Sequence, residues 1–321
     1  VVVGKSALSR IATIRVEGIK GRGIARSMAA LAKIPQSLIQ SSRIIRGFKP
    51  RVVIGVGGYA SGPAVLAARF MGVPTAIAEQ NAIPGETNKI LGRFADRIFV
   101  SFPETAGWFR KDRVLVTGNP IRAAIAGAPK RERKPGGAMT ILVFGGSQGA
   151  HRINLAVLEA LPLLGDLKGR LRIIHQTGKD DVEAVTQGYR NQAMEAKVLP
   201  FITDMAAAYG EADLLVCRAG ATSIAEITAS GKAAIFIPFP FAVNDHQTKN
   251  AELLVNRGAA AMIPERDLTG ESLSGVIRRL AQDPGKIEEM ERKAAGLGNA
   301  RAAADIVDEC VDLVLRSKSK A

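Results

Sequence analysis

The sequence predicts an α/β protein made of two Rossmann-like domains whose parallel sheets face a cleft. Short apolar runs typical of buried strands alternate with helical patterns in both halves of the chain, and glycine-rich turns follow strands in each half. A polar segment rich in Pro, Gly and charge at 128–138 separates the halves. We therefore expect domains over 1–129 and 130–300, and a C-terminal helix over 301–321 that crosses back to the first domain.

Composition narrows the class of protein. The 321 residues are 47% hydrophobic, which is ample for two sizeable cores. No apolar run reaches the roughly 18 residues of a membrane-spanning helix, and no secretion signal is recognisable. The two cysteines, Cys217 and Cys310, form no pairing pattern, so we expect a reducing compartment.

The positive charge is concentrated in the first half. Residues 1–129 hold 19 Lys and Arg against 6 Asp and Glu, a net charge of +13, whereas residues 130–321 hold 25 against 24, a net charge of +1. Such asymmetry favours an anionic partner: a membrane surface, a phosphorylated acceptor or nucleic acid. A basic surface that only confers solubility is the alternative. Nucleic acid is the weakest partner, because aromatic residues make up only 5% of the chain and no zinc-finger or RNP-type motif occurs.

The first elements are basic. A half-exposed strand is expected over 11–16, followed by a glycine-rich turn over 18–23. Residues 24–46 have an amphipathic helical pattern, interrupted at Pro35, with Lys and Arg between the apolar positions. Such a helix can lie on an anionic membrane, or it can pack its apolar side on the sheet.

Glycine and polar residues follow the next strands. The strand over 51–56 leads into a glycine loop over 57–63 and a helix over 64–70, an arrangement that lets a backbone approach a phosphate. The same glycines also suit any tight turn. The strand over 74–78 ends in Glu79-Gln80-Asn81, which suits either hydroxyl recognition or capping of the loop, and further strands are expected over 97–101 and 114–117.

The second half begins with a strand over 140–144, a glycine loop over 145–150 and a helix to about 164. The loop lacks the G-x-G-x-x-G spacing, and no acidic residue ends the next strand over 171–175, so NAD is disfavoured. It is not a Walker loop either. His175 at the end of that strand is either an acid or base or a satisfied structural residue.

The stretch 212–238 in the second half predicts a strand, a turn, a helix and a further strand. The apolar run 212–216 predicts a buried strand, and the small residues Ala219 to Ala221 predict a turn from that strand into a helix. Gly231 marks the expected end of the helix, and another strand is expected over 233–238. Free N–H groups at such a turn favour a phosphate. Glu226 has two interpretations, a ligand contact or a capping box with Ser223.

The remaining elements are a short strand over 198–202, a helix opened by Asp204, and helices over 271–315. A long polar loop precedes the helix that starts near residue 246. Side chains in this region that can hydrogen-bond to sugar hydroxyls are Asp245, His246, Gln247 and Asn250.

Several motifs together resemble one family. In chain order they are Gly57-Gly58-Tyr59-Ala60-Ser61-Gly62-Pro63, Glu79-Gln80-Asn81, Gly118-Asn119-Pro120-Ile121-Arg122, Gly145-Gly146-Ser147-Gln148-Gly149-Ala150, His175-Gln176-Thr177-Gly178, Phe201-Ile202-Thr203-Asp204-Met205 and Arg218-Ala219-Gly220-Ala221. The chain is similar, over essentially its whole length, to the MurG family of N-acetylglucosamine transferases.

That resemblance implies a GT-B fold with an N-terminal acceptor domain and a C-terminal UDP-GlcNAc domain. The implied reaction is inverting transfer of GlcNAc from UDP-GlcNAc to the muramoyl 4-hydroxyl of undecaprenyl-linked lipid I, giving lipid II for peptidoglycan synthesis, cell shape and division. The implied partners are UDP-GlcNAc, lipid I and an anionic membrane, without nucleic acid, for a peripheral protein on the cytoplasmic face of the plasma membrane. No cofactor and no metal are implied, and the chain has no Asp-x-Asp motif.

Site residues follow by position in the motifs. Asn81 and Gln247 would contact the GlcNAc hydroxyls, Arg122 and Ser147 the diphosphate, and Glu226 the ribose. Ile202 would meet uracil through its backbone. The complete donor set is Asn81, Arg122, Ser147, Ile202, Arg218, Ala221, Thr222, Ser223, Glu226, Gln247 and Asn250. The acceptor pyrophosphate would meet Gly57, Gly58, Tyr59, Ser61 and Gly62.

The catalytic base has no candidate in the chain. The family begins with a strand and a Gly-Gly-Thr-Gly-Gly-His loop whose His is the favoured base, whereas His151, His175 and His246 lie in other contexts. We expect at least one preceding βα unit of about 30 residues. A protein with that unit is expected to turn over a lipid I analogue, and the chain from Val1 is not.

Rival functions share parts of this pattern. They are a UDP-GlcNAc 2-epimerase, a glycosyltransferase acting on diacylglycerol, and a catalytically inactive, membrane-bound UDP-GlcNAc-binding protein.

Overall fold

The computed structural model describes residues 12–14, 34–127, 137–146 and 149–319. Contacts divide the chain into two units. The first unit holds the described residues up to Glu79, together with Pro84–Val116 and the chain from Asp305; the second holds Gln80–Ile83 and Thr117–Ala304. The expected glycine turn over 18–23, most of the strand over 11–16, the first part of the basic helix and most of the linker lie outside the described residues.

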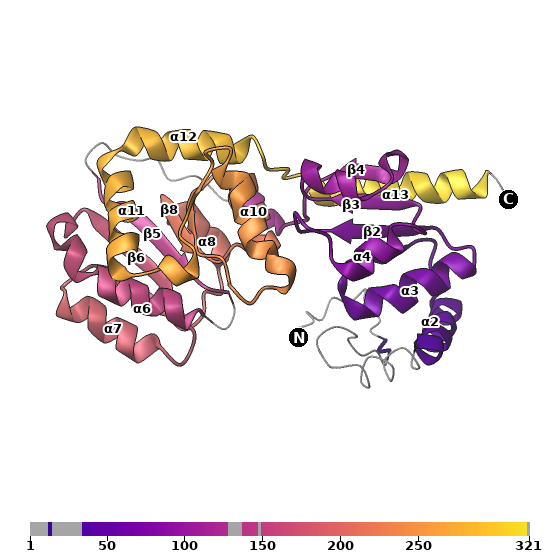
Figure 1. The fold of residues 1–321 in the computed structure, drawn as a ribbon, viewed down its shortest axis with the longest axis horizontal. Helices are drawn as coiled ribbons and strands as arrows, with labels where there is room; N and C mark the ends of the chain where they lie inside the picture. The colour runs from indigo at the N-terminus through magenta and orange to yellow at the C-terminus, as the bar shows by residue number, and fades with distance from the viewer. Residues whose placement is uncertain (1–11, 15–33, 128–136, 147–148, 320–321) are drawn as a thin grey trace. The chain divides into compact units, whose positions relative to one another are not determined.

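The first unit is built on a parallel sheet with strand order β1-β2-β3-β4 (Figure 1). The strands are β1 (Val53–Gly55), β2 (Thr75–Glu79), β3 (Arg97–Val100) and β4 (Val114–Val116). The helices are α2 (Ile34–Phe48), α3 (Gly58–Phe70), α4 (Glu86–Leu91) and α13 (Ala302–Lys318), with short 3₁₀ turns at Pro103–Trp108 and Lys111–Arg113.

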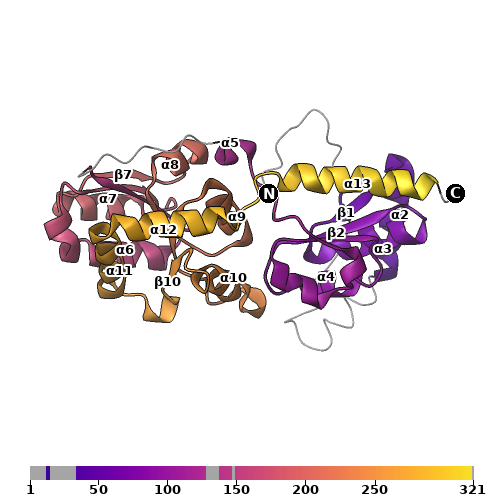
Figure 2. The same ribbon diagram turned by 90° about the horizontal axis from the view of Figure 1, so that it is seen from above.

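Both faces of this sheet are covered. On one face, Val65 of α3 and Leu91 of α4 pack against strand residues such as Ile77. On the other face, Ile306 and Cys310 of α13 pack against β2 and β3, and α13 runs along that face (Figure 2). Glu309 of α13 also accepts a hydrogen bond from Arg97 Nε at 2.6 Å. The α13 helix therefore belongs to the core of the first unit.

Helix α3 of the first unit begins earlier than the sequence-based expectation. The glycine loop expected over 57–63 is only two residues long, because α3 begins at Gly58 and includes Pro63. Gly57 precedes it with φ 87°, a left-handed conformation that glycine adopts without strain. Pro35 lies in the first described turn of α2, and because residues 15–33 lie outside the described part of the chain, the expected interruption at Pro35 stays a prediction.

The second unit has a parallel sheet of order β10-β9-β8-β5-β6-β7. Its strands are β5 (Met139–Phe144), β6 (Leu171–Gln176), β7 (Ala196–Leu199), β8 (Leu214–Cys217), β9 (Ala233–Phe236) and β10 (Ala261–Met262). Its helices are α5 (Ala123–Ala126), α6 (His151–Ala160), α7 (Val182–Asn191), α8 (Met205–Glu211), α9 (Ala221–Ser230), α10 (His246–Val255), α11 (Gly270–Gln282) and α12 (Pro284–Ala295). Short 3₁₀ turns lie at Pro162–Leu167, Val243–Asp245 and Glu265–Asp267.

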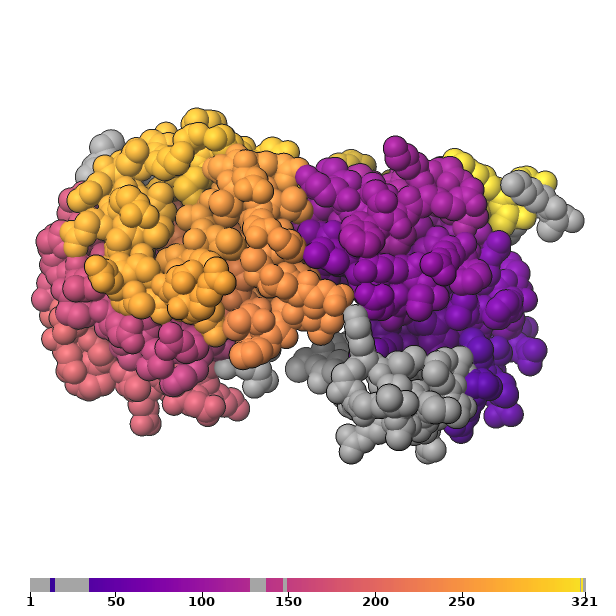
Figure 3. Space-filling model, viewed as in Figure 1, coloured from indigo at the N-terminus to yellow at the C-terminus, as the bar shows by residue number. Residues whose placement is uncertain are grey.

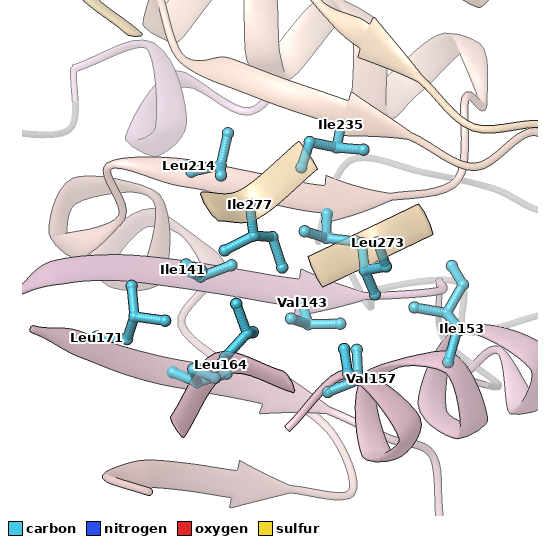
Figure 4. Close-up of a cluster of buried hydrophobic side chains, with 14 of the residues drawn as sticks. Ile141, Val143, Ile153, Val157, Leu164, Leu171, Leu214, Ile235, Leu273 and Ile277 are labelled. Atoms are coloured by element: carbon cyan, nitrogen blue, oxygen red, sulfur yellow. The ribbon is translucent and has the colours of Figure 1, made fainter. Parts of the chain in front are cut away.

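Aliphatic side chains form the core of this unit. Ile141 and Val143 of β5 pack with Ile153 and Val157 of α6, and α11 contributes residues such as Ile277 (Figure 4). In the space-filling view, α11 and α12 cover the upper part of the unit (Figure 3). This continuous core holds the carboxyl ends of the strands in fixed positions, and those ends carry the candidate site.

The division between units differs from the expected boundary at residue 129. The chain joins the second unit from Thr117, because the short helix α5 packs on α8 and α9. This division places Arg122, together with Asn81 from the segment 80–83, among the residues of the second unit.

Candidate functional site

The candidate site lies where the parallel strands of the second unit end. Loops leave β8, β5, β6 and β7 at this edge, which is where open α/β sheets bind ligands. Two pockets of about 500 and 650 Å³ are found there. They share Phe144, Gly146 and Ser223 and therefore adjoin.

The smaller pocket, called here the Glu226 pocket, collects five of the expected donor residues. These are Arg122, Ile202, Thr222, Ser223 and Glu226. Its other lining residues are Pro120, Ile121, Phe144, Gly146, Gln176, Phe201, Thr203 and Met205.

The larger pocket, called the Gln247 pocket, contains Arg218, Ser223 and Gln247 from the expected set. The glycine loop and three aromatic side chains form much of the rest. The remaining lining residues are Phe144, Gly145, Gly146, Gly149, Ala150, His151, Arg152, Gly220, Phe239, Phe241 and Glu265.

The turn from β8 to α9 has the expected position. The strand ends at Cys217, Gly220 is the N-cap residue, and Ala221 opens the helix. The N-cap makes no side-chain hydrogen bond, so the capping-box interpretation of Ser223 and Glu226 is wrong: both residues lie inside the helix. The first N–H groups of α9 and the positive end of its dipole face the edge where both pockets lie, a setting that favours an anion.

Glu226 is buried and ion-paired. Its Oε1 accepts hydrogen bonds from Arg122 Nη2 at 2.9 Å and Nε at 3.2 Å. The Arg122 side chain is 58% exposed, whereas that of Glu226 is 6% exposed. The pocket therefore holds one buried carboxylate and one accessible guanidinium that are paired with each other.

Tyr209 is a second hydrogen-bond partner of the Glu226 carboxylate. Its buried hydroxyl donates to Glu226 Oε2 at 3.4 Å. Burial, with the nearby Cys217 and Glu226, raises the pKa of Tyr209 well above its ordinary value, so the phenol stays a neutral donor. Burial likewise raises the pKa of the Cys217 thiol.

The glycine loop after β5 fits closely against the end of β6. Gly149 has φ 76°, and a Cβ there would overlap the carbonyl oxygen of Thr177. Gly146, with φ 99°, exposes its backbone to both pockets. Only glycine meets both requirements at Gly149, the conformation and the close approach.

Gln176 ties this loop to the segment after β7. Its Nε2 donates to the carbonyl of Gly146 at 2.7 Å, and its Oε1 accepts from the N–H of Ile202 at 2.9 Å. The Ile202 N–H is thus engaged within the protein.

Arg218 is held within the protein. It pairs with Glu265 and donates to the carbonyls of Ile237 and Pro238, each at 3.2 Å, while its guanidinium lies 5.3 Å from the ring centroid of Phe239. Its side chain is 13% exposed, so Arg218 chiefly shapes the wall of the Gln247 pocket.

Amide side chains organise the start of α10. Gln247 Oε1 accepts from the N–H groups of Ala219 at 3.2 Å and Phe239 at 3.0 Å. Asn250 is fully buried, and neither it nor Asn81 is among the lining residues of the two pockets. Its Oδ1 accepts from Ala82 N at 2.8 Å, and its Nδ2 donates to Asn81 Oδ1 at 3.1 Å. The structure thus brings Asn81 and Asn250 together, with Asn250 as the buried support.

His175 is a satisfied structural residue. Asn154 donates from Nδ2 to Thr177 O and Asp181, which turns its Oδ1 toward His175 Nε2 at 3.0 Å. Nε2 therefore carries the proton, and Nδ1 accepts from the Tyr189 hydroxyl at 3.0 Å. Burial lowers the pKa of His175 to about 3, and the negative charge of Asp181 acts in the opposite direction.

Of the other two histidines, His151 is exposed and His246 is half-buried. His151 Nδ1 lies 2.9 Å from Asp181 Oδ1 at the start of α6. His246 donates from Nδ1 to the Val243 carbonyl at 2.7 Å at the start of α10.

The expected acceptor residues all lie in the first unit. Gly57 and Gly58 have positive φ at the start of α3, the Ser61 hydroxyl donates to Gly57 O at 2.5 Å, and Tyr59 is 52% exposed. In the same unit, Glu79 Oε2 accepts hydrogen bonds from the Gly85 N–H and from Asn88 Nδ2. These bonds correspond to the interpretation of Glu79-Gln80-Asn81 as a motif that caps the following loop.

Some expectations remain outside these observations. Ser147 lies outside the described residues. Within the described part of the chain, no group of three or more His, Cys, Asp and Glu is placed to hold a metal ion. Sequence reasoning did not assign Gln176, Phe201, Phe239 or Phe241 to the site, although Gln176 and Phe201 stand in motifs that carried the resemblance.

Family models match both halves of the chain. Residues 3–100 match the glycosyltransferase family 28 N-terminal domain, and residues 140–309 match the glycosyltransferase family 28 C-terminal domain. A relative from Syntrophus aciditrophicus (strain SB) is 59% identical over 305 residues, covering 95% of this chain and 84% of its own length. That relative is named UDP-N-acetylglucosamine–N-acetylmuramyl-(pentapeptide) pyrophosphoryl-undecaprenol N-acetylglucosamine transferase.

Solved structures match as well. The crystal structure of Acinetobacter baumannii MurG superposes with a TM-score of 0.77 at 38% identity, covering 90% of this chain and 83% of that one. A UDP-GlcNAc 2-epimerase from Neisseria meningitidis reaches a TM-score of 0.63 at 12% identity over 91% of this chain and 83% of its own. The second likeness shows a shared fold alone.

Proposed function

The chain belongs to the MurG family within glycosyltransferase family 28, and we propose that it transfers GlcNAc from UDP-GlcNAc to the muramoyl 4-hydroxyl of undecaprenyl-pyrophosphoryl-MurNAc-pentapeptide. Members of this family are hexosyltransferases of GT-B fold, and the two parallel α/β units agree with that fold. The product would be lipid II, an intermediate of peptidoglycan synthesis. The name and 59% identity of the Syntrophus relative support this assignment.

The Glu226 pocket is the proposed place of the UDP nucleoside. The observation that carries this proposal is the pairing, at a carboxyl sheet edge, of a buried carboxylate with an accessible guanidinium beside a helix N-terminus. Glu226 would accept hydrogen bonds from the ribose hydroxyls, and Ile202 would border the uracil. Arg122, the glycine loop and the first N–H groups of α9 would surround the diphosphate, with Thr222 and Ser223 beside it.

The Gln247 pocket is the proposed place of the GlcNAc. Gln247 and Asn81 would contact its hydroxyls, while Asn250 holds Asn81 in place. Phe239 and Phe241 add apolar surface, which suits a sugar face.

Charge stabilisation is the main catalytic task of this unit. UDP leaves with added negative charge, and preorganised N–H dipoles together with Arg122 would stabilise it, so we propose turnover without a divalent metal. The acceptor hydroxyl needs a general base. Buried, neutral His175 is unsuited to that role, and the base stays unassigned in this chain.

The acceptor side is proposed for the first unit. The left-handed glycines at the start of α3 would approach the lipid pyrophosphate, and the net charge of +13 on residues 1–129 would favour an anionic membrane. Among the described residues, no helix is long and apolar enough to cross a membrane. We propose peripheral attachment at the cytoplasmic face of the plasma membrane.

Calorimetric binding of UDP-GlcNAc, UDP and uridine tests the donor assignment. We expect the wild-type chain to bind UDP and UDP-GlcNAc, and Glu226→Ala to lose at least about tenfold in affinity, since a buried hydrogen-bonding carboxylate is removed. Arg122→Met should weaken UDP binding but not uridine binding, because Arg122 would contact only phosphate and its loss frees Glu226 from the ion pair.

Arg172→Met is the matched control, because Arg172 pairs with Glu195 on the surface away from both pockets and should bind as wild type. Absence of UDP binding by the wild-type chain would contradict the donor site. Product analysis with a lipid I analogue then separates transfer from epimerisation and from binding without turnover.

A further inference from the structure

Gln176 occupies the last register position of β6, between two loops that leave neighbouring strands. It pairs with Phe144 of β5 on one side and with Leu199 of β7 on the other. The glycine loop follows Phe144, and the segment that leads to Ile202 follows Leu199. One side chain from the central strand therefore lies within reach of both loops.

The Gln176 carboxamide bonds to both loops through backbone atoms. Its Nε2 donates to Gly146 O at 2.7 Å, and its Oε1 accepts from Ile202 N at 2.9 Å. The residue is 4% exposed, so water does not readily replace either bond. A carboxamide is the group that offers a donor and an acceptor from one planar head, whereas a carboxylate of equal size only accepts.

Both bonded loops are walls of the same pocket. Gly146 and Ile202 line the Glu226 pocket together with Gln176 itself. In the proposed function, Ile202 borders the nucleobase and the glycine loop borders the diphosphate. The carboxamide thus spans the two ends of the nucleotide site.

We propose that Gln176 is a positioning residue that sets the spacing between the nucleoside and diphosphate subsites, an inference that rests on the proposed function. It acts through the backbones of Gly146 and Ile202. A ligand that occupies both subsites benefits from the preset spacing, because the backbones of Gly146 and Ile202 are already held in place before binding. A ligand that occupies one subsite benefits much less.

The test uses calorimetry to compare a ligand that occupies one subsite, uridine, with ligands that occupy both, UDP and UDP-GlcNAc. Gln176→Glu keeps the size and the acceptor but places a carboxylate oxygen against the Gly146 carbonyl, while Gln176→Met keeps the size and removes both bonds. We expect each variant to lose about ten- to a hundredfold in affinity for UDP and UDP-GlcNAc, with a loss of no more than about threefold for uridine. Thermal unfolding is recorded for each variant in parallel.

Gln187→Glu is the matched control, because Gln187 is exposed on α7 and its side chain donates to Asn191 there, outside both pocket linings. Wild-type UDP affinity in both Gln176 variants would overturn the inference. Equal losses for uridine and UDP would also overturn it, since they indicate general damage to the unit. The wild-type measurement separates the two proposals: no UDP binding by the wild-type chain would contradict the proposed function, whereas wild-type binding that both Gln176 variants retain would contradict this inference alone.

Discussion

His175 illustrates how surroundings decide what a polar residue does. Its imidazole is fully buried, and each ring nitrogen has one protein partner, Asn154 or Tyr189. Burial disfavours the charged ring, so the pKa falls to about 3 in the folded protein. In the unfolded chain the ordinary value of about 6.5 returns.

A pH dependence of stability follows. Between pH 6.5 and about 3 the unfolded chain binds a proton that folded His175 does not bind, so stability falls as the pH drops through that window. At or above pH 7 the contribution is fully present. We expect His175 to account for about 2 kcal/mol of lost unfolding free energy between pH 7 and pH 5, measured by urea denaturation at both values.

His175→Gln should flatten this pH slope even though the variant is less stable throughout, and His246→Gln, at a half-buried histidine that bonds to the Val243 carbonyl, serves as control. An unchanged slope in His175→Gln would contradict the neutral, buried assignment.

Glu226 shows where residue-level sequence reasoning stops. Ser223 and Glu226 have the spacing of a capping box, and the spacing alone could not separate that role from a ligand contact. The structure removes the capping role, because the helix begins at Ala221. The ion pair with Arg122 joins residues 104 positions apart in sequence, and no local pattern predicts such a contact.

At the scale of elements, the glycine loop between β5 and α6 depends on close backbone packing. We expect Gly149→Ala to lower the unfolding free energy by about 2 kcal/mol or more, because alanine is strained at φ 76° and its Cβ would overlap Thr177 O. UDP affinity should fall with it, since the same loop lines both pockets.

Replacing a second glycine, Gly275, by alanine should change the unfolding free energy in the opposite direction. Gly275 lies inside α11 with nothing near its missing Cβ, so Gly275→Ala should raise the unfolding free energy by about 0.5–1 kcal/mol. Thermal and urea unfolding of both variants check the pair. A shift of both variants in the same direction would contradict this account of the two glycines.

Strands and helix ends were the most predictable elements. Apolar runs placed β2, β5 and β8 within a residue or two of their observed bounds, because a buried parallel strand needs a continuous apolar run. Gly231 ends α9 in the left-handed conformation expected of a helix C-terminus. The start of α3 was less predictable, because its small residues suit a loop and a closely packed helix equally. The Cβ of a larger residue at Gly55 would come within 2.7 Å of Val65 Cγ2, and that closeness is visible only in three dimensions.

At the scale of the whole molecule, charge and exposed apolar surface occur together in the first unit. Its helices α2 and α3 pack on each other through Ile45, Ala67 and Ala68. The same helices leave Phe48 and Phe70 exposed, at 48% and 77%. The sequence showed the charge asymmetry and the basic helix, but it left open whether that helix packs or meets a membrane. The structure shows that packing uses only part of α2, so the two roles are compatible.

The last prediction concerns this surface. We expect the chain to bind vesicles containing phosphatidylglycerol more tightly than neutral vesicles, with affinity falling as salt rises, because each Lys or Arg near an anionic surface contributes about 1 kcal/mol before screening. Phe70→Ser should weaken vesicle binding by about tenfold or more in a sedimentation assay, since an inserted Phe side chain contributes about 1.5–3 kcal/mol. Leu163→Ser, an exposed apolar site of the second unit, is the matched control and should bind as wild type. Equal losses of vesicle affinity in both variants would contradict a specific membrane-facing surface on α2 and α3. Vesicle binding that is independent of lipid charge and salt concentration would contradict it as well. In that case the positive charge of the first unit would serve solubility or the acceptor pyrophosphate alone.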